Sequence, residues 1–340
     1  MILSIENSNA RLQDYGIQIP LLAERYTKTL EALEQHAKLS QCKDKWLLTA
    51  NTKPLSREQL LRVHTQSYVE ALLSENPLRV MGEVFEFIDS GGHFNERFVE
   101  HENNRPLSEL VEKRLAHAAG TLVACETALA QGFCYFLGGG AHHAMTTGGR
   151  GFCLVHDLLI AVRELQARGQ VKTVWVIDLD AHKGDGTAEI TIADPSVLTL
   201  SIHMQEGWPL DESPLDDQGQ LKRCFWPSTV DIPVPIGAES AYLELLRHGL
   251  QQLEVCAGGR LPDLALVVDG SDPFEKDVLQ SAKLMQLSLE QCVDRTRLVH
   301  DWLQERGVPQ AYVMAGGYGP ENWRVHAGFL LDILPRRIFG

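Results

Sequence analysis

The sequence lacks any run approaching the roughly 20 apolar residues that a membrane-spanning helix needs. Its opening, MILSIENSNARLQDYG, also lacks the basic stretch followed by an apolar stretch that is typical of a secretory signal. We therefore expect no membrane contact and no secretion.

Basic side chains are outnumbered, with 31 Lys and Arg against 45 Asp and Glu, and the formal net charge is −14. A field of this sign repels phosphate backbones, which argues against nucleic-acid partners. It favours cationic ligands such as lysine-bearing peptides or polyamines.

Paired cysteines are also missing. The seven cysteines form no CxxC motif, and their number is odd. Scattered cysteines of this kind are typical of reduced, mostly buried thiols in a cytoplasmic protein, and we predict that location. They are Cys42, Cys125, Cys134, Cys153, Cys224, Cys256 and Cys292.

What the sequence does contain is an alternation of short apolar runs with longer amphipathic ones. Near-continuous apolar runs are expected for parallel strands that are covered on both faces. Without a repeat or a linker, the pattern predicts one α/β domain over residues 1–340, a doubly wound, mainly parallel sheet flanked by helices. The expected strands are 133–137, 173–178, 197–202, 264–268 and 311–314.

Helices are expected over 110–130, 157–168, 240–256 and 279–306. The first hundred residues look mainly helical, most clearly over 56–73, where Ser56 and Gln59 have the spacing of a capping box. Residues 82–104 and 211–219 are expected to be loops.

Polar residues follow four of the five expected strands. Ligands bind at the carboxyl ends of the strands in an open parallel sheet, so these segments predict one active site. The segments are Gly138–His143, Asp178–Asp185, Asp269–Asp272 and Ala315–Tyr318.

Asp180 and His182 stand two residues apart, so they can point the same way from an extended strand end. With one further carboxylate they would complete the three-ligand set of a catalytic zinc site, and Asp272 is the candidate. Gly184 and Gly186 tighten the same loop. A solvated acidic turn is the alternative for such a motif.

His142 and His143 follow three glycines, and adjacent histidines must play different roles because they cannot enter one pocket in the same way. Asp178 and Asp185 offer one carboxylate partner for each imidazole. Tyr318 follows two glycines and is a candidate donor to a developing oxyanion.

Together these motifs resemble the zinc-dependent histone deacetylase family, including bacterial deacetylase-like proteins and acetylpolyamine amidohydrolases, which share an arginase/deacetylase-like fold. The resemblance runs from about Leu60 to Tyr318. It rests on GGGAHHA, GFC, DLDAHKGDG, LSIH and GGY, which occur in the family's order.

The resemblance implies a role for each candidate residue. The metal, zinc or ferrous iron, would be bound by Asp180, His182 and Asp272. The catalytic group would be His142, His143 and Tyr318, with Asp178 and Asp185 as the partners of the two histidines. The substrate channel would include Gly151, Phe152 and Leu279. A structural potassium ion would be held by Asp178 and Ser201.

The third metal ligand requires a choice between two acids. Family members carry the ligand Asp, four residues and a second Asp, and Asp272 with Asp277 fits that spacing whereas Asp269 does not. The chain departs from the family at Lys183, where a second histidine is common, at His156, where Asn is usual, and at Ala315, which replaces a glycine.

The function that follows is zinc-dependent hydrolysis of acyl-lysine, in peptides or proteins, or of related acylated amines. An acetylpolyamine substrate is the alternative within this chemistry, and a homo-oligomer is possible. The other candidates are an arginase-like ureohydrolase, which needs more bridging carboxylates, and an inactive acyl-lysine-binding scaffold.

Overall fold

The computed structural model describes residues 1–6, 10–19, 24–89 and 91–340. Within them lies one eight-stranded sheet in the order β2-β1-β3-β8-β7-β4-β5-β6, in which every pair of neighbours is parallel. The strands are β1 (Ile2–Ile5), β2 (Leu47–Ala50), β3 (Phe133–Phe136), β4 (Val174–Asp178), β5 (Val197–Met204), β6 (Val230–Val234), β7 (Leu264–Val268) and β8 (Gln310–Val313).

The helices fill the connections between strands. The α-helices are α1 (Glu24–Glu34), α2 (Arg57–Leu61), α3 (Gln66–Leu72), α4 (Leu78–Val84), α5 (Leu107–Gln131), α6 (Asp157–Ala167), α7 (Asp185–Thr191), α8 (Tyr242–Cys256), α9 (Leu289–Glu305) and α10 (Trp323–Phe339). The short 3₁₀ helices are η1 (Leu12–Tyr15), η2 (Leu39–Lys45), η3 (Arg223–Phe225), η4 (Glu239–Ala241) and η5 (Gln280–Ala282).

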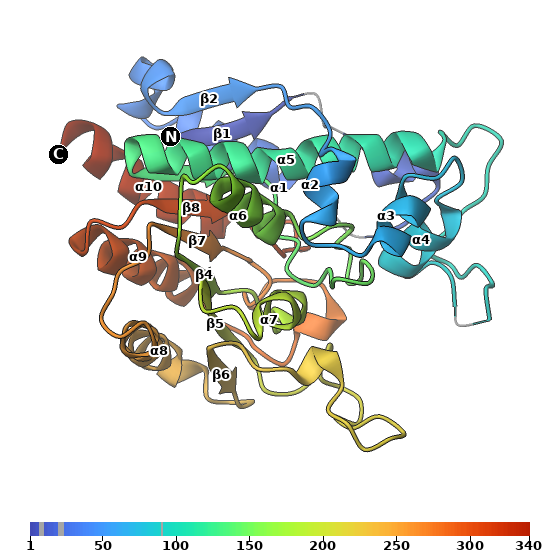
Figure 1. Cartoon of the computed structure of the whole chain (residues 1–340). Helices are drawn as coiled ribbons and strands as arrows, with labels where there is room; N and C mark the ends of the chain where they lie inside the picture. Colours follow the sequence, from blue (N-terminus) through green and yellow to red (C-terminus); the bar gives the residue numbers. More distant parts are fainter. Residues whose placement is uncertain (7–9, 20–23, 90) are drawn as a thin grey trace.

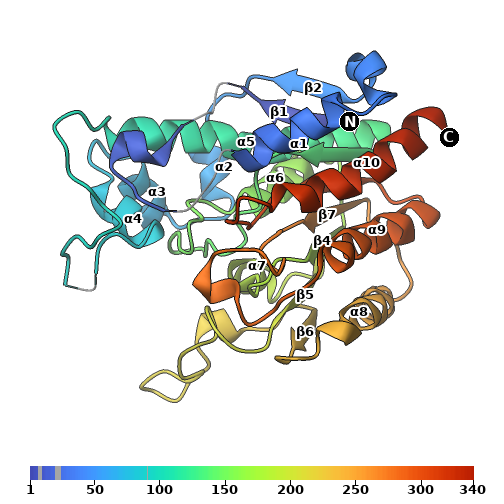
Figure 2. The same cartoon turned by 180° about the vertical axis from the view of Figure 1, so that it is seen from behind.

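Both faces of the sheet are covered. Alternate strand residues enter two separate cores: Phe136 and Val176 pack on one side, Tyr135 and Ile177 on the other. Helices α5 and α6 cover the face seen in Figure 1, whereas α1, α8, α9 and α10 cover the face seen in Figure 2. The predicted doubly wound parallel α/β fold is therefore confirmed.

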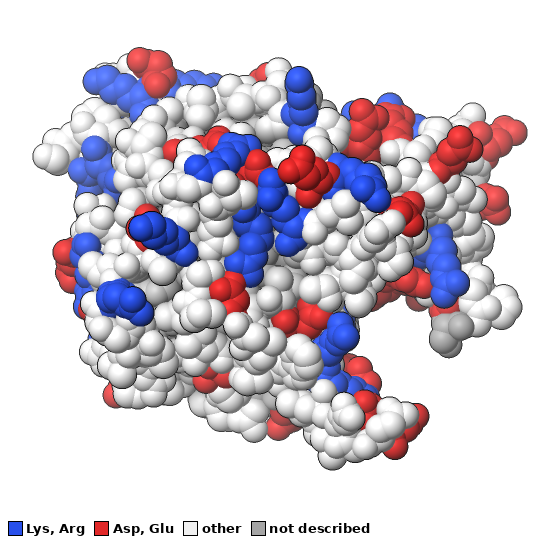
Figure 3. All heavy atoms as spheres, in the orientation of Figure 1, with Lys and Arg blue, Asp and Glu red and all other residues white. Residues whose placement is uncertain are grey.

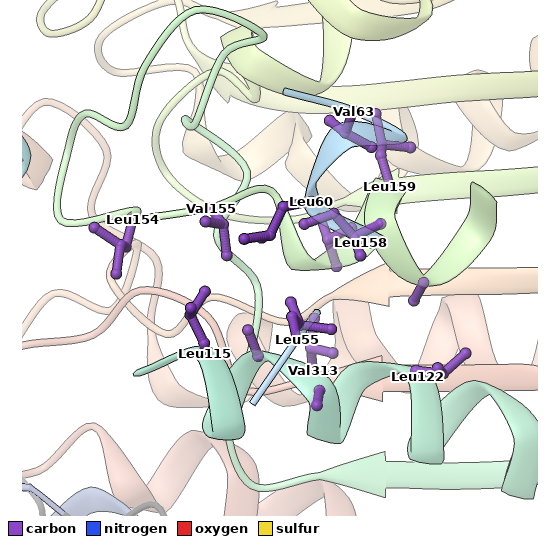
Figure 4. Packing of buried hydrophobic residues seen from close by; sticks show 14 of the residues in the cluster. Leu55, Leu60, Val63, Leu115, Leu122, Leu154, Val155, Leu158, Leu159 and Val313 are labelled. Atoms are coloured by element: carbon purple, nitrogen blue, oxygen red, sulfur yellow. The ribbon is translucent and has the colours of Figure 1, made fainter. Parts of the chain in front are cut away.

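The core beneath α5 and α6 also anchors a loop that reaches the site. Figure 4 shows Leu115 and Leu122 of α5 facing Leu158 and Leu159 of α6, with Val155 beside them. Burial of each such side chain stabilises the fold by about 1.5–3 kcal/mol. The segment leading into α6 is held by this packing, and Phe152 lies three residues upstream of Val155.

Three strands escaped the sequence prediction. β1 and β2 lie in the first hundred residues, which look mainly helical, and each has only four residues. β6 contains Pro233 and forms a sheet edge, where a missing backbone N–H is tolerated. β3 and β8 are as short as β1 and β2 but lead into glycine-rich motifs, whereas no such motif follows β1 or β2. Partners distant in sequence stabilise the strands that were missed.

Several helix boundaries also differ. The expected helix over 56–73 is two helices, α2 and α3, although the capping box between Ser56 and Gln59 is present. The expected helix over 279–306 begins only at Leu289, where Ser288 and Gln291 form a second capping box. The C-terminal α10 was not predicted, and the loop expected from residue 82 begins after α4 ends at Val84.

One other expectation, that of free and mostly buried cysteines, agrees with the structure. All seven cysteines are free thiols, and six are buried; Cys256 is exposed. No helix among the described residues is both long enough and apolar enough to cross a membrane.

The strand order explains where the polar motifs meet. β3, β8, β7 and β4, the four strands expected to carry them, are consecutive neighbours in the parallel sheet. Their carboxyl ends therefore lie side by side along one edge, and the four polar segments converge there.

Candidate active site

A cavity of about 480 Å³ opens at this edge. The loop between α4 and α5 and the loop between β5 and β6 both contribute to its wall, and Figure 3 shows the surface hollowed between these two projections. Its lining residues are Glu86, Arg97, His143, Gly151, Phe152, His182, Trp208, Asp211, Val278, Leu279, Gln280, Ser281 and Tyr318.

Asp180, His182 and Asp272 form a buried cluster beside the cavity. His182 Nδ1 lies 3.1 Å from Asp180 Oδ1 and 2.9 Å from Asp272 Oδ2. Asp272 Oδ1 accepts a hydrogen bond from Ala181 N at 3.1 Å, whereas its buried Oδ2 accepts none. The oxygen that faces the cluster is thus the one without a hydrogen-bond donor.

The charges of this cluster suit a cation. Burial opposes protonation of His182, but Asp180 and Asp272 outweigh burial and raise the pKa of the imidazole to about 10. Two carboxylate oxygens and one imidazole nitrogen within 4.8 Å of one another are also the donor set of a catalytic zinc site. The residues present therefore fit the metal that the sequence predicts.

The carboxylate of Asp269, the acid not chosen as third metal ligand, contacts Tyr135, Thr296 and His326 instead of the cluster. Its carboxylate accepts hydrogen bonds from Tyr135 Oη at 2.7 Å and Thr296 Oγ1 at 2.8 Å, and His326 Nδ1 lies 3.3 Å away. These buried contacts give Asp269 a structural role inside the fold.

His142 is bound to the end of β4. Its Nδ1 donates to Asp178 Oδ2 at 2.7 Å, and its Nε2 lies 3.7 Å from Asp180 Oδ1. Burial lowers the imidazole pKa, but the two carboxylates more than compensate and raise it to about 9. The two carboxylates therefore favour the protonated form of His142.

His143 has the opposite protonation preference. Its Nδ1 donates to Asp185 Oδ1 at 2.7 Å, which leaves Nε2 with the lone pair. Burial, together with the nearby His142 and His182, holds its pKa well below the ordinary value. Asp185 is buried and pairs through Oδ2 with Arg150 at 2.9 Å. His143 is thus a neutral imidazole, able to accept a proton.

Tyr318 lies in the cavity wall, and hydrogen bonds to two buried carboxylates hold the backbone around it. Its N–H donates to Asp277 Oδ2 at 2.7 Å, and the nearby Gly316 N–H donates to Asp180 Oδ2 at 3.0 Å. Burial and the charges of Asp272 and Asp180 raise the phenol pKa well above its ordinary value. The hydroxyl therefore keeps its proton and can donate it in a hydrogen bond.

Aromatic side chains form much of the channel. Phe152 meets Tyr318 at 6.0 Å between ring centres, and Trp208 packs edge-on against His143 at 4.5 Å. Gly151 and Phe152 both have positive φ, +54° and +64°, which is unusual for Phe and marks a strained turn. The three expected channel residues, Gly151, Phe152 and Leu279, all line the cavity.

Replacing Gly151 by alanine is expected to lower kcat/KM for the amide hydrolysis that the sequence predicts, by about tenfold or more. A Cβ atom there would meet Trp208 Cη2 at 2.3 Å and His143 Cδ2 at 2.9 Å, so at least one ring must move. Steady-state kinetics measures this loss. Zinc content, which should not change, is measured alongside to show that the metal site is intact. Gly148→Ala is a matched control, since a Cβ there meets nothing within 4 Å. Equal kinetics for Gly151→Ala and wild type would contradict the close packing.

Asp178 and Ser201, the expected potassium ligands, are cross-strand partners between β4 and β5. Ser201 Oγ lies 3.0 Å from His203 Nδ1 and accepts from Gly184 N at 3.4 Å. Potassium there stays a prediction.

Two departures from the family pattern have structural partners. Lys183 is buried and pairs with Asp231 at 2.7 Å. His156 caps α6 by accepting from Leu159 N through Nδ1 and contacts Thr187 through Nε2. Both side chains are therefore satisfied within the fold.

His64 supports the loop that carries the two histidines. Its Nδ1 donates to Met145 O and its Nε2 accepts from His156 N, both at 3.0 Å, so the ring must be neutral. Burial lowers its pKa from 6.5 to about 4. Between these two pKa values the unfolded chain binds a proton at His64 and the folded chain does not. His64 therefore does not lower stability above pH 6.5, and the stability lost through it grows as the pH falls toward 4.

The loss of stability attributable to His64 between pH 6.5 and pH 4 is expected to be about 3 kcal/mol. Denaturant unfolding across this pH range measures it. His64→Gln offers one donor and one acceptor but does not titrate, so its stability should depend less on pH. Identical pH slopes for wild type and variant would contradict the assignment.

Sequence reasoning missed several residues at the site, among them Trp208, Ser281 and Arg150. Trp208 lies in a loop and Ser281 in η5, both outside any motif, and Arg150 precedes Gly151 on an irregular turn. Arg150 reaches both Asp185 and the ring of Trp208, whose centre lies 5.1 Å from the guanidinium carbon. Its position next to the GFC motif was the one available signal.

Comparison with known proteins agrees with this geometry. The histone deacetylase domain family matches residues 19–333. An uncharacterized protein of Picosynechococcus sp. is 34% identical over 210 residues, 62% of this chain and 64% of that protein. Histone deacetylase 2 of Arabidopsis thaliana is 27% identical over 272 residues, 80% of this chain and 64% of that protein. The matches thus span less than two thirds of these relatives.

A similar fold has been seen in a crystal. The structure of an HDAC homolog complexed with SAHA superposes with a TM-score of 0.67, covering 97% of this chain and 82% of that chain at 22% identity. The family match over most of the chain, the shared fold and the converging motifs lead to one conclusion: this chain belongs to the histone deacetylase family.

Proposed function

We propose that the protein is a zinc-dependent amidohydrolase that removes acetyl or other short acyl groups from lysine side chains or related amines. One observation carries this proposal: the cavity brings the Asp180–His182–Asp272 cluster together with neutral His143 and protonated Tyr318. A proton acceptor, a hydrogen-bond donor and a cation site are the parts that amide hydrolysis requires.

Asp180, His182 and Asp272 would hold the metal. A bound divalent ion there supplies Lewis acidity toward a water molecule and the acyl carbonyl. The protein's own contribution is to keep the three donor atoms together, with Asp180 fixed by Gly316 N and Asp272 by Ala181 N.

His143 acts in this proposal as general base and then as general acid. Its Nε2 takes the proton of the attacking water while Asp185 stabilises the imidazolium through Nδ1. When the C–N bond breaks, the same nitrogen returns the proton to the departing amine, so the products are a short carboxylic acid and a free amine. His142, already cationic beside Asp178, contributes charge without moving a proton.

Tyr318 is the proposed donor to the oxyanion that develops on the acyl oxygen. The walls formed by Phe152, Trp208 and Leu279 are apolar and suit the alkyl chain of an acyl-lysine or an acylated polyamine. The net charge of −14 favours cationic substrates of either kind.

A substrate panel on zinc-loaded protein tests the proposal. Acetyl-lysine peptides, longer acyl-lysine peptides and acetylpolyamines are compared, with acid and free amine both quantified. We expect hydrolysis of at least one of these classes, its loss with a chelator and its return with zinc. Absence of hydrolysis from every member, with folded and metal-loaded protein, would favour an acyl-lysine-binding scaffold.

One observation keeps the ureohydrolase alternative open. A second group, His142, His143 and Asp180, shares Asp180 with the proposed ligand set, and two neighbouring groups are what a two-metal site would use. Against it, His142 and His143 each direct Nδ1 to a separate carboxylate. Urea release from guanidino compounds, included in the panel, tests this alternative.

Four expectations complete the proposal: a single catalytic domain over residues 1–340, a structural potassium ion, a cytoplasmic location and a possible homo-oligomer. Elemental analysis and sedimentation of the purified protein test the second and the fourth.

A further inference from the structure

The two ring nitrogens of His182 have different surroundings. Nδ1 faces the carboxylates of Asp180 and Asp272, whereas Nε2 lies 3.1 Å from Ser281 Oγ on the opposite edge of the ring. A neutral imidazole carries one N–H and one lone pair, and a metal ion needs the lone pair. If Nδ1 is the metal-binding nitrogen, the proton must reside on Nε2.

We propose that Ser281 is a positioning residue for the metal site. Its hydroxyl oxygen accepts the Nε2–H of His182, which fixes the tautomer with the Nδ1 lone pair toward Asp180 and Asp272. Partners of this kind hold the ring orientation of metal-binding histidines and raise their basicity. The inference rests on the proposed metal-dependent function and adds a residue to it.

The backbone around Ser281 is held firmly. Ser281 lies in η5, and the turn begins at Leu279, whose N–H donates to Asp277 Oδ1 at 2.7 Å. Ala282, the next residue, is buried in the core. The hydroxyl is therefore presented to His182 by a fixed turn.

Asp277 joins this turn to the proposed oxyanion donor. Its Oδ1 accepts from Leu279 N, and its Oδ2 accepts from Tyr318 N at 2.7 Å. One buried carboxylate thus sets the position of the turn that carries Ser281 and of the backbone that carries Tyr318. The channel wall and the metal-binding ring are connected through it, since Leu279 and Ser281 both line the cavity.

The aromatic contacts of His182 cannot select the tautomer. Trp208 and His143 pack against the ring at 5.6 and 5.9 Å between ring centres, and such contacts restrict its plane without accepting a proton. Among the described residues, Ser281 is the hydrogen-bond partner of Nε2.

The test measures zinc affinity, which needs no substrate. Zinc is titrated into chelator-stripped protein in competition with a chromophoric chelator. Ser281→Ala is expected to bind zinc roughly 10- to 100-fold more weakly. Ser281→Thr keeps a hydroxyl and should stay close to wild type. Gln280→Ala removes the exposed neighbour in the same turn and should leave the affinity unchanged.

Two results would overturn the inference: a folded Ser281→Ala with a zinc Kd within twofold of wild type, or a Ser281→Thr as weak as Ser281→Ala. If Ser281→Ala does not fold, Ser281→Cys replaces it, and its affinity should be lowered because a thiol is a weak acceptor. A wild type that binds no zinc would contradict the proposed function. A wild type that binds zinc but hydrolyses no amide would contradict the proposed function and not the role of Ser281, which the zinc affinities of the variants still decide.

Discussion

Asp180→Ala and His182→Ala are each expected to abolish both bound zinc and amide hydrolysis. The cluster offers three ligand atoms, and a three-ligand site cannot spare one donor. Asp272→Ala should behave in the same way, because its hydrogen-bond-free Oδ2 faces the cluster. Elemental analysis of the purified variants, together with hydrolysis rates, measures both losses.

Asp269→Asn is the matched control, because it alters a buried acid only three residues before Asp272. Its partners are Tyr135, Thr296 and His326, so we expect a lower melting temperature but full zinc content. Full zinc occupancy in folded Asp180→Ala or His182→Ala would refute the ligand assignment. Zinc loss in Asp269→Asn with zinc retained in Asp272→Ala would reverse the choice between the two acids.

Tyr318→Phe is expected to lower kcat by roughly 10²- to 10³-fold, the usual cost of one lost oxyanion donor. The phenol is protonated and its backbone is fixed by Asp277, so the substitution removes the hydroxyl and little else. KM should change little where it reflects substrate binding, and zinc content should match wild type. Steady-state kinetics on metal-loaded protein measures the effect.

Tyr312→Phe provides the control for this change, since its hydroxyl donates to Gln310 within the core. Its kcat should stay near wild type. A kcat within a few-fold of wild type for folded, metal-loaded Tyr318→Phe would remove Tyr318 from the catalytic group and leave it as a packing residue at the channel.

The central strands and their polar ends could be predicted because each carries its own signal. The runs that became β3, β4, β7 and β8 are buried on both faces and nearly continuous in apolar residues, and each leads into Gly, Asp or His. Parallel strands place such ends on one edge, so the convergence followed from general topology. β1 and β2 are as short as β3 and β8, but no glycine-rich motif follows them, so the sequence gives no further signal for a strand there.

The prediction of the helix boundaries was wrong for a different reason. The apolar pattern continued across 279–306, but Ser288 and Gln291 already carried the signal for a helix start at Leu289. Residues before that start became η5 and the turn that presents Ser281.

Loop residues at the site were beyond the reach of sequence patterns. Trp208 lies four residues after β5, and only the folded loop brings its ring against His143 and His182. Ser281 reaches the cavity because Asp277 holds the turn before it. Such contacts depend on tertiary packing, for which a single sequence offers no periodicity or spacing.

The central claim is that one divalent ion, held by Asp180, His182 and Asp272, supports amide hydrolysis. The measurement that tests it most directly is a zinc titration of chelator-stripped protein, followed by hydrolysis of the best substrate from the panel. We predict that activity rises linearly and saturates at one zinc ion per chain. Saturation only at two ions per chain, or hydrolysis that persists in fully stripped protein, would contradict it.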